Sequence, residues 1–171
     1  MKRFKVLCLA VSMLGLALLP GSVVAQQKSL REQLVGAWEL VSCDRTTAHA
    51  VKQPYCVNPN GILILDASGR YAHMIGARGR PKLSNVSHVD APAEQYKAAA
   101  QAFLANFGTW SVNEKDRTLV RHYEGAIIPN FEGTDSKMPV TIVGDELTVA
   151  GSENNADLDH GRYVTVYRRV K

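Results

Sequence analysis

The feature that most constrains the fold of this chain is a succession of short segments in which apolar and polar residues alternate and which end in turn residues. Alternation over about four to eight residues is typical of β-strands with one buried face. The sequence contains eight such segments: residues 37–44, 62–66, 71–76, 107–112, 118–124, 140–143, 146–150 and 163–170. Closing such a meander removes the edges that an open sheet exposes. The pattern therefore predicts an all-β fold, an eight-stranded antiparallel up-and-down barrel.

One segment departs from the strand pattern. Residues 93–106 follow Pro92 and are rich in good helix formers, which predicts one helix inserted between the third and fourth strands. Four of its apolar residues recur at helical spacing: Tyr96, Ala99, Ala100 and Phe103. We expect this apolar stripe to lie on the sheet.

The first 25 residues have the layout of a secretory signal. A basic start with Lys2, Arg3 and Lys5 precedes an apolar run over residues 6–19, and short residues lead to Ala25. That run has 14 residues, fewer than the roughly 20 that a membrane-spanning helix needs. The sequence predicts a signal peptide over 1–25 that is cleaved, one domain over 26–171, export to the periplasm or the extracellular space, and no membrane span after cleavage.

Cleavage after residue 25 changes both the charge and the cysteine count. It removes three basic and no acidic residues, so 17 Lys and Arg face 16 Asp and Glu and the net charge falls from +4 to +1. Without a basic stripe, a nucleic-acid partner is not expected. It also removes Cys8 and leaves Cys43 and Cys56, which predict a disulfide in an oxidising compartment.

A series of motifs resembles a known family. Gly36-Ala37-Trp38 opens the first predicted strand and resembles the Gly-x-Trp motif of lipocalins and the wider calycin group. Further segments extend the likeness: residues 34–42, 61–64, 107–110, 122–124 and 129–134. Together they resemble the bacterial lipocalin-like domain family over about residues 34–170. The resemblance implies a calycin-type barrel with one open mouth that binds a small hydrophobic or amphipathic molecule.

The same resemblance assigns structural roles. Gly36 and Trp38 are expected to be structural, and an arginine near the end of the last strand is expected to pack across the tryptophan. Arg168 and Arg169 both stand near that position, and only one of two adjacent strand residues can face inward. Arg168 is our candidate, with Arg169 as the alternative.

Four residues are predicted to contact a ligand besides the pair described below. Ala72 and Met74 share one face of the third strand and fit a roomy, adaptable pocket wall. Trp110 would either stack on a ligand or plug the barrel beneath the inserted helix. Asn130 lies in an apolar loop after the fifth strand, where it could orient a ligand.

His122 and Glu124 form the strongest candidate for catalysis. They stand two residues apart on one face of the fifth strand, and if that face points inward they could act as a general acid–base pair. The alternative is that they hydrogen-bond at the mouth or face solvent. The first reading would make the protein an isomerase or cyclase of a small metabolite. A third reading is a filled barrel with a structural or interaction role, which an apolar patch on the outer wall would favour.

Other chemistries find no support in the sequence. The histidines are His49, His73, His88, His122 and His160, and no two have the short spacing common among zinc ligands. Neither the nucleophile elbow Gly-x-Ser-x-Gly nor the dinucleotide motif Gly-x-Gly-x-x-Gly occurs. We expect no metal and no cofactor.

Overall fold

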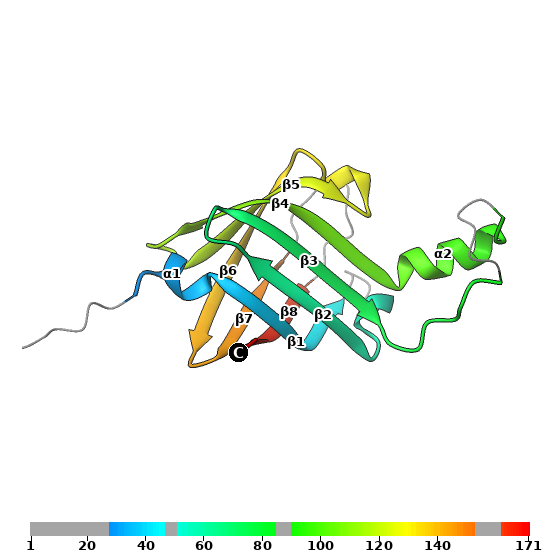
Figure 1. Ribbon diagram of the computed structural model, residues 1–171, viewed down its shortest axis with the longest axis horizontal. Helices are drawn as coiled ribbons and strands as arrows, with labels where there is room; N and C mark the ends of the chain where they lie inside the picture. Colours follow the sequence, from blue (N-terminus) through cyan, green and yellow to red (C-terminus); the bar gives the residue numbers. More distant parts are fainter. Residues whose placement is uncertain (1–27, 47–50, 85–89, 153–161) are drawn as a thin grey trace, which may run out of the picture.

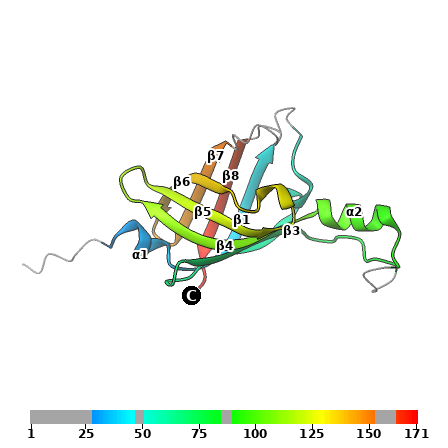
Figure 2. The same cartoon turned by 90° about the horizontal axis from the view of Figure 1, so that it is seen from above.

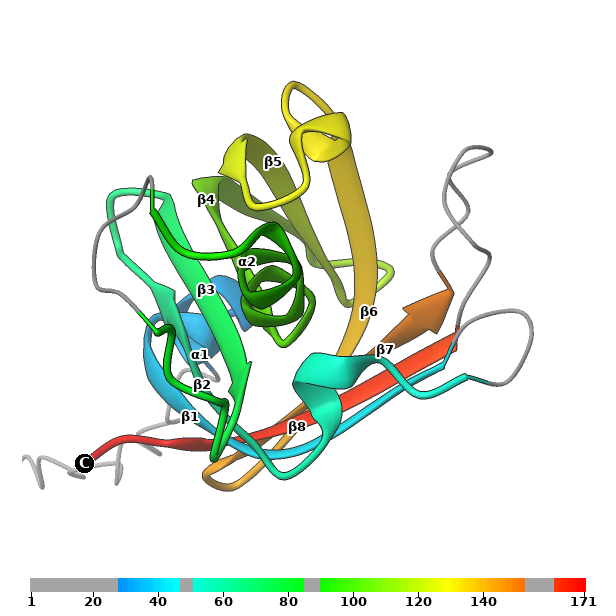
Figure 3. The same cartoon turned by 90° about the vertical axis from the view of Figure 1, so that its right-hand side faces the viewer.

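The computed structural model describes residues 28–46, 51–84, 90–152 and 162–171, and within them the strands form a closed antiparallel barrel (Figure 1). The strands are β1 (Gly36–Thr46), β2 (Pro59–Leu65), β3 (Arg70–Ala77), β4 (Phe103–Asn113), β5 (Thr118–Ala126), β6 (Asp135–Val143), β7 (Glu146–Ser152) and β8 (Arg162–Arg169). Each strand pairs with its neighbour in sequence, and β8 pairs with β1 to close the ring that Figure 3 shows end-on. The predicted fold is confirmed.

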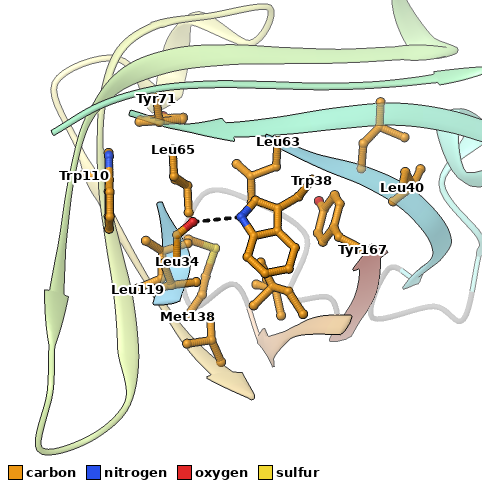
Figure 4. Close-up of a cluster of buried hydrophobic side chains, with 14 of the residues drawn as sticks. Leu34, Trp38, Leu40, Leu63, Leu65, Tyr71, Trp110, Leu119, Met138 and Tyr167 are labelled. Carbon is orange, nitrogen blue, oxygen red and sulfur yellow. Dashed lines mark hydrogen bonds between the residues drawn. The ribbon is translucent and has the colours of Figure 1, made fainter. Parts of the chain in front are cut away.

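One end of the barrel is closed by the short helix α1 (Leu30–Leu34). Trp38 stands directly above it, fully buried, and its indole Nε1 donates a hydrogen bond of 2.8 Å to the carbonyl of Leu34 (Figure 4). The guanidinium of Arg169 covers the indole, with its carbon 4.0 Å from the ring centroid, and donates to the carbonyl of Val35. These contacts form the floor of the barrel.

The structure corrects the choice of arginine at the floor. Arg169, opposite Trp38 in the register of β1 and β8, packs on the tryptophan, whereas Arg168 stands opposite Glu39 and points outward. The adjacent Gly36 has φ +136°, a conformation that L side chains rarely adopt, and a Cβ there would lie 3.0 Å from Arg169 Nη1. The glycine of the motif is therefore required by its backbone and by the arginine.

The inserted helix differs from its prediction. α2 (Ala93–Gln101) ends five residues early, and β4 takes over at Phe103 to pair with Gly76 of β3. None of its residues is buried, and Figure 2 shows it projecting from the end of the barrel opposite α1. The prediction that its stripe lies on the sheet is wrong.

A disulfide joins Cys43 of β1 to Cys56 of the short 3-10 helix η1 (Pro54–Cys56), as predicted. Both cysteines are buried. Because β1 runs from the floor to the open end, the bond holds η1 at the mouth of the barrel. None of the helices in the described residues is long and apolar enough to cross a membrane.

Candidate functional site

The middle of the barrel contains buried polar side chains among the apolar ones. They come from the inward faces of five strands, because alternate residues of a strand face the interior. The buried polar residues are Arg45, His73, Asn106, Arg121 and Thr165, and the buried tyrosines are Tyr71, Tyr123, Tyr163 and Tyr167. Two guanidinium groups in a barrel interior are unusual, since arginine is almost never fully buried without a partner.

Arg121 of β5 is at the centre of this group and is 4% exposed. Its Nη1 donates to Nδ1 of His73 at 3.0 Å, and its Nη2 donates to the hydroxyl of Tyr123 at 3.2 Å. Nη2 also lies 3.1 Å from the sulfur of Met138. None of the ion pairs within the described residues involves Arg121.

The hydrogen bonds around His73 fix its protonation. A guanidinium can only donate, so Nδ1 of His73 accepts from Arg121 and the ring proton is on Nε2. Nε2 donates to the hydroxyl of Tyr167 at 2.8 Å. Burial and the positive charges of Arg121 and Arg45 lower the pKa of His73 well below its usual range. Burial raises the pKa of Tyr167 to about 12, so both groups are neutral at neutral pH.

The neutral state of His73 predicts a pH dependence of stability. In the unfolded chain His73 takes up a proton as the pH falls below about 6.5, whereas in the folded chain it does not. The free energy of unfolding should therefore fall with decreasing pH, by up to about 1.4 kcal/mol per pH unit from this residue. His73→Gln should flatten this slope, because an amide can accept from Arg121 and donate to Tyr167 without titrating.

Urea denaturation at a series of pH values between about 4.5 and 7 measures this slope. His122→Gln, which replaces a histidine on the outer face of β5, is the matched control. A slope that is the same for His73→Gln and the wild-type chain would contradict a depressed pKa at His73.

A pocket of about 350 Å³ opens at the mouth of the barrel, the end opposite Trp38. It is lined by η1, the end of α2, the start of β4 and the segment after β5, mainly through Pro54, Tyr55, Phe103, Leu104, Ile127 and Ile128. Leu104 also belongs to the buried core, and the hydroxyl of Tyr55 accepts from Nη1 of Arg45 at 3.5 Å. The pocket therefore borders both the apolar core and the polar interior.

The predicted ligand contacts Ala72, Met74 and Glu124 come together, but outside the barrel. They stand on the outer faces of β3 and β5 and line a groove of about 590 Å³ on the outer wall. Phe107 and Ile127 complete its apolar lining, and Phe107 is 51% exposed. The groove is a partly apolar surface on the outer wall, with Glu124 and Glu132 among its lining residues.

His122 and Glu124 also lie on the outer face. His122 Nδ1 is 2.7 Å from the carboxylate of Asp135, and Glu124 binds the guanidinium of Arg70 through both oxygens. The inward face of β5 carries Leu119, Arg121 and Tyr123 instead. The acid–base hypothesis needed the two side chains inside the barrel, and the structure places them on the exposed outer wall, His122 beside Asp135 and Glu124 beside Arg70.

Trp110 and Asn130 are separated by the length of the barrel. Trp110 is buried near the floor, where its Nε1 donates to the carbonyl of Asp66 at 2.9 Å and the guanidinium of Arg31 stands 4.6 Å from its ring. It lies beneath α1, not beneath the inserted helix. Asn130 is exposed in the 3-10 helix η2 (Pro129–Phe131), outside the lining of the mouth pocket, while its neighbour Phe131 stacks on Tyr123.

No group of three or more metal-ligating side chains occurs in the part of the chain that the structure describes. His49, His88 and His160 lie outside it. The sequence reasoning missed Arg121, His73 and Tyr167 as a buried network. The only signal in the sequence was the alternation of residues along β3 and β5. It groups the residues of β5 into two faces, but it does not show which of the two faces points into the barrel.

The family that the chain matches agrees with this architecture. A family model described as a lipocalin-like domain matches residues 35–170. No curated protein matches the chain. Among solved structures, bovine odorant binding protein in complex with a selenium-containing odorant is similar, with 11% sequence identity and a TM-score of 0.44 over 85% of this chain and 74% of that one.

Proposed function

Because the chain belongs to the lipocalin-like domain family, we propose that its barrel binds a small apolar or amphipathic molecule through the open mouth. The observation that carries this proposal is the apolar pocket of about 350 Å³ at the mouth. The opposite end is sealed by Trp38, Leu34 and Arg169, so the mouth is the end at which a ligand would enter.

Export is part of the same proposal. Residues 1–25 have the layout of a cleaved signal, and residues 26–171 would form the exported domain. The Cys43–Cys56 disulfide fits a protein of the periplasm or the extracellular space. N-terminal sequencing of the secreted chain should place Gln26 first.

The binding experiment needs a signal from the mouth. Both tryptophans, Trp38 and Trp110, are buried at the floor, so intrinsic fluorescence reports on the wrong end of the barrel. A neutral fluorescent probe, N-phenyl-1-naphthylamine, and its displacement by 1-dodecanol measure binding directly. We expect both to bind, and we expect 1-dodecanol to raise the melting temperature as a ligand of the folded state.

Three lysine substitutions at exposed apolar positions locate the site. Ile128→Lys places a charge in the mouth pocket and should weaken probe binding about tenfold, a loss of about 1.4 kcal/mol. Phe107→Lys alters only the outer groove, and Val143→Lys, 73% exposed beside the turn between β6 and β7 at the floor end, is the matched control.

The pattern of effects decides where the ligand binds. Weakening by Ile128→Lys alone supports the mouth. Weakening by Phe107→Lys alone contradicts the proposal and assigns binding to the outer groove, the second candidate site. If the folded, oxidised protein binds no probe at all, a small-molecule function at either site is contradicted.

A further inference from the structure

Arg121 is a buried cation for which the described residues provide no anion. We propose that the natural ligand carries an acidic group that binds Arg121 inside the barrel, while the apolar part of the ligand points toward the mouth. This inference rests on the proposed function and names the chemical class of the ligand: an amphipathic acid, such as a long-chain carboxylate.

The first support is the charge of the barrel interior. The guanidinium of Arg121 is always protonated, and burying a charge without a counter-charge costs several kcal/mol. Its two hydrogen-bonded neighbours, His73 and Tyr123, bring no negative charge to it at neutral pH. The charge of Arg121 is therefore not offset by its hydrogen-bonded neighbours, and an anion beside it would be stabilised.

The second support is a pair of buried hydrogen-bond donors that lack acceptors. Nε of Arg121 and the hydroxyl of Tyr71 are both buried and make no hydrogen bond within the described residues. They belong to one cluster, because the guanidinium carbon of Arg121 lies 5.4 Å from the Tyr71 ring centroid and 5.5 Å from that of Tyr123. Two donors that lack acceptors in one cluster match the oxygens of a carboxylate.

Access to the cluster requires a side chain to move. Nε of Arg121 and the Tyr71 hydroxyl are shielded from solvent, so an acceptor reaches them only when a neighbour gives way. Met138 could make room beside the guanidinium, since its sulfur lies 3.1 Å from Nη2 of Arg121 and its unbranched side chain changes rotamer readily. A ligand would thus replace a weak sulfur contact by a charged hydrogen bond.

The test compares an acid with its neutral counterpart at one chain length. Dodecanoic acid and 1-dodecanol compete with N-phenyl-1-naphthylamine for the oxidised wild-type protein at pH 7.5 and fixed ionic strength. We expect the acid to bind at least tenfold more tightly. Arg121→Gln should remove this preference, so that the acid and the alcohol bind it with affinities within about twofold of each other, and Arg121→Lys should keep part of the preference. Arg70→Gln, which removes an arginine from the outer wall, should keep all of it.

A second readout separates ligand binding from a purely structural role. A carboxylate beside Arg121 offsets its charge, so dodecanoic acid should raise the pH at which the His73 imidazole titrates in ¹⁵N NMR spectra, whereas 1-dodecanol should not. This measurement uses the wild-type protein and remains decisive if Arg121→Gln fails to fold.

Each outcome decides the inference. A preference for the acid that depends on Arg121, with the shift at His73, supports it. Equal binding of acid and alcohol, or an acid preference unchanged in Arg121→Gln, overturns it and leaves the proposed function intact. If neither dodecanoic acid nor 1-dodecanol binds, the proposed function and the inference are overturned together.

Discussion

Replacing Trp38 by alanine is expected to lower the free energy of unfolding by about 3–5 kcal/mol, the range for large aromatic residues removed from a core. Trp38 is fully buried, and its ring is packed beneath Arg169 and against Leu34, Leu63 and Leu65 (Figure 4). The substitution also leaves the Leu34 carbonyl without the indole donor. Urea denaturation followed by far-UV circular dichroism measures the change, because the variant lacks one of the two tryptophan fluorophores.

A matched pair of arginine variants tests the same floor. Arg169→Gln removes the guanidinium that covers the indole and donates to Val35, whereas Arg168→Gln changes the neighbouring outward residue. We expect Arg169→Gln to destabilise the protein clearly more than Arg168→Gln. Equal effects of the two arginine variants would mean that the guanidinium of Arg169 does not stabilise the floor. A loss below about 1.5 kcal/mol in Trp38→Ala would mean that the floor collapses around the missing ring.

The barrel could be predicted from the sequence because strand periodicity and turn residues repeat along the whole chain. The predicted ends of the strands were less accurate where helix and strand propensities compete. Residues 103–106 follow a run of alanines and continue its helical pattern, yet pairing of β3 with β4 places Leu104 and Asn106 inside the barrel. Tertiary pairing outweighs the small helix preferences of these residues.

The inward face of β5 could not be predicted by polarity. One face carries Val120, His122 and Glu124, and the other carries Leu119, Arg121 and Tyr123, so each offers one apolar residue and ionisable or polar companions. In the structure, partners on other strands accompany each orientation. Glu124 accepts hydrogen bonds from Arg70 on the outer wall, and Arg121 donates to His73 of β3 inside the barrel. Contacts between strands 48 residues apart in sequence are invisible to a pattern read along one strand.

Removal of the Cys43–Cys56 disulfide is expected to lower the free energy of unfolding by about 3 kcal/mol. The bond closes a short loop, with a sequence separation of 13, and the estimate follows from the loop entropy of the unfolded chain. The double variant Cys43→Ala/Cys56→Ala, compared with the wild-type chain in urea, measures it. A change below about 1 kcal/mol would show that η1 holds its place by packing alone.

The same variant tests how the mouth is built. Pro54 and Tyr55 line the mouth pocket and stand next to Cys56 in η1, so the disulfide attaches part of the pocket wall to the inner face of β1. Without it, ligand binding must also order η1, and we expect N-phenyl-1-naphthylamine to bind several-fold more weakly at temperatures where the variant is still folded. Unchanged affinity would place the ligand away from η1. Weaker binding would mean that oxidation does more than stabilise the fold, because it shapes the mouth that the ligand enters.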